Sequence, residues 1–356
     1  MRRLIYLFLL LILTGCRDTS PPFKNDIPYD SPSGSHAIPN NMPPAEYTRF
    51  SFVSLELFDT VTHIMGYARS QEEFDAFVNI MYGELQRLYR LFDAFNGYSD
   101  IHNIFTINAE AGIRPVEAHP DLLDMIKTGI RAYHMTDGVV NIAIGPITAI
   151  WRTYISSGEA SLPDMDALRA ADRFTDINGI IIDEEKGTVF LSHAGMALDV
   201  GSIGKGYALE RAVQKAIDAG FASFILSVGG DVRTANGPPG GNGNRNGNAW
   251  RIGVNDPIHP SAMIDTLSVA DLAVFTSGDY LRGPHIIDPR TLLPADTVRS
   301  ATVIHPDGIT AEILSLAVFI MDIGTARELL ANHGAEVLWV MADGSVISTE
   351  GFGRYR

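Results

Sequence analysis

From residue 50 onward, runs rich in aromatic and β-branched residues alternate irregularly with segments of helical periodicity, and this alternation limits the fold more than any other feature of the sequence. In residues 71–92, apolar residues recur at spacings of three and four, which predicts a helix with one apolar face. In residues 180–192, two β-rich runs flank a charged turn that contains glycine, which predicts a hairpin. The regular strand–helix rhythm of a doubly wound sheet is missing. We therefore expect an α+β fold, with mixed or antiparallel sheets and packed helices, in a single body over residues 50–356.

The composition is that of an acidic globular protein. The 356 residues are 46% hydrophobic and 19% charged, which is enough apolar material for a sizeable core. The formal net charge is -15, whereas a broad nucleic-acid interface needs clustered lysine and arginine. We therefore expect no nucleic-acid partner, although a local basic pocket for one anionic small molecule is compatible with this charge.

The first 16 residues, MRRLIYLFLLLILTGC, have the pattern of a secretory signal, in which two arginines precede an apolar run that is short for a membrane span. Cys16 is the only cysteine of the chain, and residues 13–16 resemble a bacterial lipobox, whose cysteine is lipidated. The alternative is an ordinary hydrophobic leader with an incidental cysteine. Residues 17–49 are rich in proline, serine, asparagine and aspartate, which predicts a flexible tether. We therefore expect a lipoprotein that a lipid anchor on Cys16 holds at the outer side of a bacterial cytoplasmic membrane.

A glycine-rich turn is the strongest local candidate for a binding site. The stretch LDVGSIGKGYALERA, residues 198–212, places three glycines and Lys205 between a strand-like run near Asp199 and an expected helix. Glycines allow the backbone to approach a ligand closely, and a helix N-terminus offers N–H groups to an anion. The turn therefore predicts a phosphate cradle with Lys205 as its cation. The alternative is a strand-to-helix turn with a solvated lysine, and the Walker pattern fails because Gly206 follows Lys205.

Three further stretches carry polar residues at turns, and each is a weak signal alone. They are DGVVNIAIGPITAIW (residues 137–151), VFTSGDYLR (residues 274–282) and GPHIIDPRT (residues 283–291). The sequence contains no HExxH, GxSxG or CxxC motif, and its ten histidines form no pair at i, i+4. A zinc site made of histidines is therefore not expected. By itself, a lone histidine such as His285 is more often a hydrogen-bonding residue than a catalyst.

Taken together and in order, these stretches resemble the ApbE family, the FAD:protein FMN transferases. The family pattern starts with a strand and FDT, found here at Phe58–Thr60, and segments similar to residues 99–108 and 137–151 follow. It continues with segments that stand in this chain as DVGSIGKGYALE, VGGDV, WRIGVNDP, TSGDY, HIIDPRTLLP and AEILSLAVFIMD. The match covers residues 52–355, so the resemblance extends over the whole expected body.

The resemblance implies an enzyme that cleaves FAD with the help of Mg²⁺, passes FMN to a threonine hydroxyl of a membrane or secreted flavoprotein, and releases AMP. It places the FAD contacts at Phe58, Phe95, Val139, Val140, Asn141, Asp199, Lys205 and Ile286. It places the Mg²⁺ ligands at the backbone carbonyl of Ser202 and at the side-chain positions of Glu312 and Leu316. It makes His285 the candidate that orients or deprotonates the acceptor, and Lys205 the cation that stabilises the reacting phosphates.

The chain departs from the family pattern at several polar positions. Glu312 stands where the family has aspartate, and Leu316 stands where it has threonine, although leucine cannot ligate a metal. Asn141 replaces another aspartate, and Leu292 replaces a glycine. Three functions therefore stay open: FMN transfer to a protein, FAD binding without turnover on a tethered lipoprotein, and hydrolysis of FAD to FMN and AMP with water as the acceptor.

Overall fold

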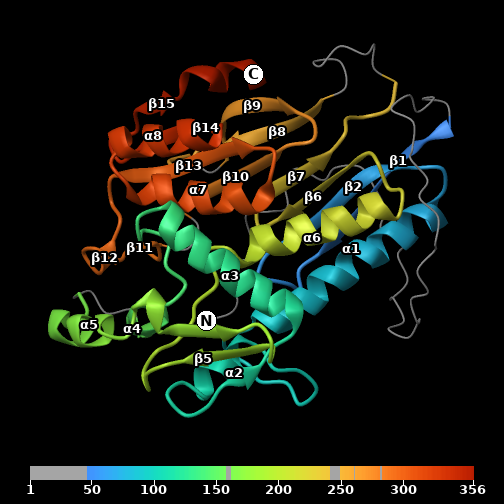
Figure 1. Cartoon of the computed structure of the whole chain (residues 1–356). Helices are drawn as coiled ribbons and strands as arrows, with labels where there is room; N and C mark the ends of the chain where they lie inside the picture. Colours follow the sequence, from blue (N-terminus) through green and yellow to red (C-terminus); the bar gives the residue numbers. More distant parts are fainter. Residues whose placement is uncertain (1–45, 158–161, 241–248, 260, 281–282) are drawn as a thin grey trace. The chain divides into compact units, whose positions relative to one another are not determined.

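The computed structural model describes residues 46–157, 162–240, 249–259, 261–280 and 283–356. Over these residues the chain forms a large antiparallel sheet that is covered by helices on one face (Figure 1). The expected signal sequence, Cys16 and most of the expected tether lie outside the described residues. None of the described helices combines the length and the apolar character that crossing a membrane requires.

Within the described ranges, the main sheet has eight strands, and every pair of neighbours in it is antiparallel. In spatial order the strands are β1 (Thr48–Ser54), β2 (Thr62–Ala68), β6 (Phe224–Val228), β7 (Asp231–Ala235), β10 (Ala273–Gly278), β13 (Val298–His305), β14 (Glu336–Met341) and β15 (Val346–Ser348). This spatial order follows the chain order. The sheet is therefore a meander, and the remaining elements are insertions between its neighbouring strands or extensions of them.

The helices and the small sheets make up these insertions and the C-terminal end. The helices are α1 (Gln71–Phe92), α2 (Ile104–Ala109), α3 (Pro120–Met135), α4 (Gly145–Ser157), α5 (Met165–Asp172), α6 (Gly204–Asp218), α7 (Gly308–Ile320), α8 (Ile323–His333) and the 3-10 turns η2 (Ile177–Gly179) and η3 (Glu350–Tyr355). The small sheets contain β3 (Val116–Glu117), β5 (Thr188–Leu191) and β4 (Ile180–Asp183), the pair β8 (Trp250–Asn255) and β9 (Met263–Val269), and the pair β11 (Ile287–Asp288) and β12 (Leu293–Pro294).

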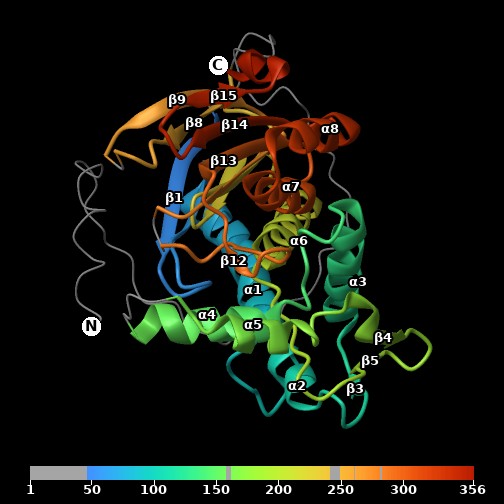
Figure 2. The same cartoon turned by 90° about the vertical axis from the view of Figure 1, so that its left-hand side faces the viewer.

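Strand β14 contributes apolar side chains to both faces of the main sheet. Val337 and Trp339 belong to the core under α1, α6 and α7, whereas Leu338 and Val340 belong to a second apolar cluster on the opposite face. Successive side chains of a strand point to opposite faces, so a strand that is apolar throughout requires cover on both sides. The β8–β9 hairpin and η3 provide the second cover, and Figure 2 shows the hairpin and the helices on opposite sides of the sheet.

The predicted α+β fold with antiparallel sheets is confirmed. The helix expected at 71–92 is α1, the helix expected after the glycine-rich turn is α6, and the hairpin expected at 180–192 is β4–β5. The short helices α2 and α5 were not predicted, because six to eight residues span only about two turns of periodicity; strand β9 was also not predicted. Strand β1 begins at Thr48, within the segment 17–49 that we expected to be tether.

Helix α4 is joined to the β11–β12 hairpin by a third apolar cluster. Ile147 and Trp151 of α4 pack in this cluster with Ile287 and Leu292. The indole Nε1 of Trp151 also donates a hydrogen bond to the carbonyl oxygen of Leu292 over 2.8 Å. The segment that follows His285 is therefore fixed against α4.

At Leu292, backbone strain destabilises the fold and side-chain packing stabilises it, and a substitution can test which effect is larger. Its φ is +63°, in the left-handed region, which costs a residue with a Cβ about 1–2 kcal/mol. Its side chain is buried, and removing a buried leucine side chain costs about 2–5 kcal/mol. We therefore expect Leu292→Gly, which restores the family's residue, to lower the free energy of unfolding by about 2 kcal/mol in urea titrations. Asp137→Gly is the control, because Asp137 has a φ of +51° but an exposed side chain, and it should be neutral or slightly stabilising. A more stable Leu292→Gly variant would show that strain outweighs packing here.

Candidate functional site

Asp199 anchors the glycine-rich turn that precedes α6. Its backbone N–H donates to the carbonyl oxygen of Ile142 over 2.8 Å, and its Oδ1 accepts from the N–H of Gly201 at 3.0 Å. Its Oδ2 accepts from the hydroxyl of Thr148 at 2.7 Å and from the guanidinium of Arg152 at 3.2 Å. Thr148 and Arg152 belong to α4, so the Asp199 carboxylate ties the turn to that helix.

The start of α6 already holds one carboxylate. No side chain caps the helix at Ile203. The N–H of Gly206, in the first turn, donates to Oε2 of Glu312 over 2.7 Å. Because the N-terminus of a helix favours negative charge, this contact satisfies a backbone donor and the buried Glu312 carboxylate together.

Lys205 lies between two carboxylates that come from other elements. Its Nζ is 2.6 Å from Oδ2 of Asp231, at the start of β7, and 2.7 Å from Oε1 of Glu312, on α7. The lysine side chain is 26% exposed, and the carboxylate side chains are 6% exposed. Oδ1 of Asp231 accepts from the N–H of Thr276 on β10 at 3.0 Å, which connects the cluster to the TSGDY segment. We call Lys205, Asp231 and Glu312 the lysine cluster.

The surroundings of the lysine cluster shift the pKa values of Lys205 and Glu312. Burial alone would lower the pKa of Lys205, but the charges of Asp231 and Glu312 outweigh burial and raise this pKa. Burial raises the pKa of Glu312, and the nearby Lys205 offsets only part of that effect. The ammonium group is therefore held in its charged form and in a fixed place, as a phosphate-binding cation requires.

The donors at the expected Mg²⁺ positions do not fit the ion. Glu312 has a carboxylate, but Lys205 occupies one of its oxygens and the N–H of Gly206 occupies the other. Leu316 has no donor atom, and its side chain packs against the main core. Mg²⁺ prefers six oxygen ligands in octahedral geometry. Of the three expected ligands, the backbone carbonyl of Ser202 is the one that these contacts do not affect. The hydroxyl of Ser202 is buried and has no hydrogen-bond partner among the described residues. The described residues also contain no group of three or more His, Cys, Asp or Glu side chains that could hold a metal.

The double variant Glu312→Asp, Leu316→Thr tests this disagreement with the family pattern. We expect calorimetric titration with Mg²⁺ alone to show no saturable site that involves Glu312 in the natural chain. The double variant should gain a site, because the shorter carboxylate frees itself from Gly206 and the threonine adds an oxygen one helical turn away. The matched control is Leu316→Val, which adds no oxygen. Saturable Mg²⁺ binding by the natural chain that Glu312→Gln abolishes would contradict the expectation.

The three expected FAD contacts at residues 139–141 are buried. The side chains of Val139 and Val140 are buried in the main core. The side chain of Asn141 is also buried, where its Nδ2 donates to the carbonyl oxygen of Thr175 at 2.9 Å and its Oδ1 accepts from the N–H of Ala143 at 2.8 Å. Asn141 thus has a structural role in holding this loop, in which all three residues are buried.

The two aromatic residues among the expected FAD contacts, Phe58 and Phe95, differ in their exposure and in their neighbours. Phe58 has a φ of +54° in the turn after β1, and its half-buried ring meets the ring of Tyr89 edge-on at 5.2 Å. Phe95 is 60% exposed, and the guanidinium of Arg152 lies over its ring at 4.4 Å from the centroid. Phe95, Arg152 and Asp199 therefore form one continuous group on the surface.

His285 and Ile286 precede the β11–β12 hairpin. Ile286 is buried in the main core, whereas His285 is exposed. Nδ1 of His285 lies 2.8 Å from the carbonyl oxygen of Gly283, so the neutral imidazole carries its proton on Nδ1 and its basic lone pair on Nε2. This tautomer is the one that a general base acting through Nε2 needs.

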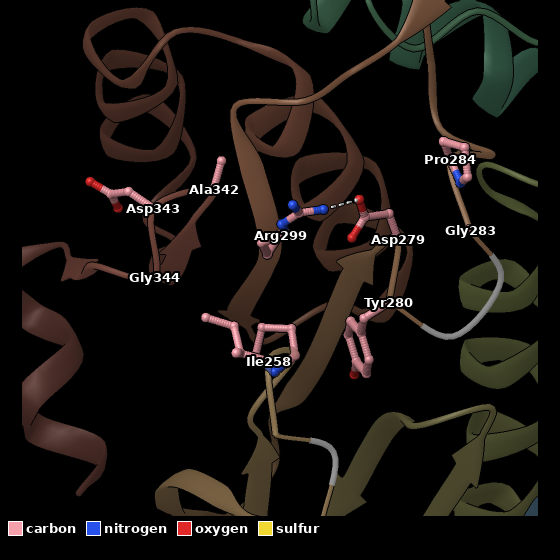
Figure 3. Close-up of a pocket in the computed structure, with 10 residues that line it drawn as sticks. Ile258, Asp279, Tyr280, Gly283, Pro284, Arg299, Ala342, Asp343 and Gly344 are labelled. Atoms are coloured by element: carbon pink, nitrogen blue, oxygen red, sulfur yellow. Dashed lines mark hydrogen bonds and ion pairs between the residues drawn. The ribbon is translucent and has the colours of Figure 1, made fainter.

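A pocket of about 630 Å³ opens next to this segment (Figure 3). Its lining residues are Pro257, Ile258, Asp279, Tyr280, Gly283, Pro284, Arg299, Ala342, Asp343 and Gly344. Arg299 and Asp279 form an ion pair of 3.2 Å in its wall, and the Tyr280 ring lies beside Ile258. Burial raises the pKa of Tyr280, a hydrogen bond with Asn255 partly offsets this effect, and the charge of Asp231 adds to it.

The structure brings four of the expected residues, Lys205, Glu312, Phe95 and Asp199, into two linked groups. The lysine cluster is one, and the group of Phe95, Arg152 and Asp199 is the other; the glycine-rich turn connects them. Asp231, Thr148 and Arg152 were not predicted as site residues. Asp231 follows two glycines at a strand end, a signal that could have been used, whereas nothing local marks Thr148 or Arg152 on α4.

The sequence profile of the ApbE family matches residues 58–339, which is most of the chain. The chain belongs to the ApbE family. The ApbE profile includes the glycine-rich turn, both site groups and the segment of His285. All the expected contacts other than Cys16 therefore lie within the shared region.

Several relatives of the chain are named as transferases. The chain is 30% identical to the FAD:protein FMN transferase of Klebsiella pneumoniae (strain 342) over 247 residues, which cover 65% of this chain and 74% of the relative. It is also 30% identical to the FAD:protein FMN transferase of Treponema pallidum (strain Nichols) over 273 residues, which cover 69% of this chain and 72% of the relative. Both of these relatives thus have the same name, FAD:protein FMN transferase.

Solved ApbE structures share the fold. The ApbE protein of Thermotoga maritima superposes with a TM-score of 0.75 at 26% identity, over 86% of this chain and 99% of that protein. The flavin transferase ApbE of Vibrio cholerae superposes with a TM-score of 0.73 at 20% identity, over 87% of this chain and 100% of that protein. The meander with its inserted helices is therefore the ApbE fold.

Proposed function

We propose that this ApbE-family protein transfers FMN from FAD to a threonine hydroxyl of an acceptor flavoprotein and releases AMP. The observation that carries the proposal is the lysine cluster, which holds the ammonium of Lys205 at the glycine-rich start of α6. A fixed cation and backbone N–H groups stabilise the charge that develops on phosphate oxygens during transfer. The names of the relatives support FMN transfer over other reactions at a pyrophosphate.

The proposed reaction balances through groups of this chain. The acceptor oxygen forms a bond to the phosphorus of the FMN moiety, and the bond from that phosphorus to the oxygen of the AMP moiety breaks. The hydroxyl proton goes to Nε2 of His285, whose Nδ1 is held by the carbonyl of Gly283. The pocket of Figure 3 supports this role, because a side chain that enters it approaches the segment of His285. When a Mg²⁺ ion binds in this family, it supplies charge neutralisation; since the donors here do not fit it, Lys205 takes that role in our proposal.

The location that we propose follows from the sequence. A lipid on Cys16 and a tether between Cys16 and the start of β1 at Thr48 hold the body at the outer side of the cytoplasmic membrane, where acceptors that are membrane or secreted flavoproteins are within reach. Labelling of the expressed protein with a radioactive fatty acid tests the anchor. Label that persists in Cys16→Ser would refute it.

The deciding experiment incubates the detergent-solubilised full chain with FAD and an acceptor protein that a known ApbE transferase modifies. We expect flavin fluorescence that stays on the acceptor in a denaturing gel, together with one AMP for each flavin bound. Free FMN and AMP without labelled acceptor would instead support an FAD pyrophosphatase. Stoichiometric FAD that stays intact would support a second candidate, a binding protein without turnover, which the loss of a ligand at Leu316 favours.

A further inference from the structure

The glycine-rich turn has a shortage of positive charge. Three carboxylates, those of Asp199, Asp231 and Glu312, surround it, and Lys205 balances only one of them. The pyrophosphate of FAD is a dianion, so carboxylates at this turn repel it unless a further cation is present. Since the expected metal ligands do not fit Mg²⁺, this cation has to come from the chain.

Arg152 is a described cation in contact with the turn. Its Nη2 is 3.2 Å from Oδ2 of Asp199, and its side chain is 50% exposed. A guanidinium has five N–H donors in a planar fork, so one contact with Asp199 leaves donors for a phosphate. The guanidinium lies over the Phe95 ring, 4.4 Å from its centroid, and this contact restrains the long side chain where it meets Asp199.

We propose that Arg152 binds the pyrophosphate of FAD, with Asp199 and Phe95 positioning its guanidinium. This proposal rests on FAD being the ligand of the proposed function, but it does not require that transfer occurs. It accounts for the position of an exposed arginine between two expected FAD contacts, and it gives the turn the charge that Lys205 alone does not supply. Arg152 then has a specific role that the family motif does not assign to it.

The test measures equilibrium binding of three ligands to the full chain in detergent: FAD, ADP, which has the pyrophosphate without the flavin, and riboflavin, which has the flavin without phosphate. Arg152→Gln should weaken the binding of FAD and ADP about ten- to hundredfold. Any binding of riboflavin should stay within about twofold of that of the natural chain. Arg152→Lys should keep part of the affinity for FAD and ADP. Added salt should reduce this affinity more in the natural chain than in Arg152→Gln, because the variant lacks the charge that salt screens.

The matched control is Arg251→Gln, which makes the same charge change at an exposed position on β8. It should leave all three affinities unchanged. Unchanged or tighter FAD binding by Arg152→Gln would overturn the proposal and make Arg152 a surface residue that covers Asp199. If the natural chain binds FAD through Arg152 but labels no acceptor, the proposed transfer fails while the inference about Arg152 stands. A natural chain that binds neither FAD nor ADP overturns the inference directly.

Discussion

Replacing Lys205 with methionine is expected to lower kcat/KM for flavin transfer at least about 100-fold, because the substitution removes the fixed cation of the phosphate cradle. Methionine keeps the length and apolar stem of the lysine, so the variant separates charge from packing. The expected result is a loss of transfer with FAD as substrate, measured by flavin fluorescence on the acceptor. Transfer within about threefold of the natural rate would rule out Lys205 as the phosphate-binding cation.

The same substitution is expected to destabilise the fold by about 3 kcal/mol at neutral pH, since removing one partner of a buried ion pair leaves the other charges uncompensated. Without Lys205, the buried Asp231 and Glu312 face each other, and burial already raises the pKa of Glu312. A carboxyl whose pKa is raised in the folded state loses stability as the pH rises through that pKa. The deficit of Lys205→Met should therefore be smaller at pH 5 than at pH 8 in urea titrations.

Lys186→Met is the control for this effect on stability. Lys186 and Asp183 form an ion pair with the same Nζ–Oδ2 distance of 2.6 Å, but the lysine is 78% exposed. Solvent screens an exposed pair, so its contribution to stability is small and this variant should be nearly as stable as the natural chain. Equal effects of the two substitutions would mean that the lysine cluster is no more sensitive than a surface pair.

Gly206→Ala is expected to weaken both the fold and the binding of FAD. A Cβ at this position would lie 2.8 Å from the carbonyl oxygen of Gly308 and 2.9 Å from Cβ of Glu312, so α6 and α7 would have to separate. Overpacking of this kind costs about 3 kcal/mol, which outweighs the gain of about 1 kcal/mol from placing alanine in a helix. We therefore expect a net loss of about 2 kcal/mol in thermal or urea unfolding, and weaker FAD binding as Glu312 is displaced from Lys205.

Gly83→Ala provides the matched control on another helix. Gly83 lies within α1, and a Cβ there would meet no atom within 4 Å. Only the helix propensity changes, so this variant should be more stable by about 0.5–1 kcal/mol. If Gly206→Ala were also stabilising, the close approach of α6 to α7 would not limit the residue at this position.

The sequence predicted the parts of the fold and site that depend on neighbouring residues. Helix α1 was visible as a stripe of apolar residues, and the turn before α6 was visible because glycines permit its backbone. The metal positions show the limit of such reasoning. The sequence indicated that Leu316 cannot ligate, but not that Lys205 and Gly206 occupy both oxygens of Glu312.

Family, fold class and the identity of the cationic residue were thus determined by the sequence itself, since motifs, periodicity and turn chemistry are local properties. Only the tertiary structure decided which charges meet. Lys205 is separated from Asp231 by 26 residues and from Glu312 by 107, and Arg152 is separated from Asp199 by 47. These contacts arise because α4, α6, α7 and β7 pack around one turn, and the effect of each charge depends on its burial there. A pattern of neighbours in the sequence does not contain that information.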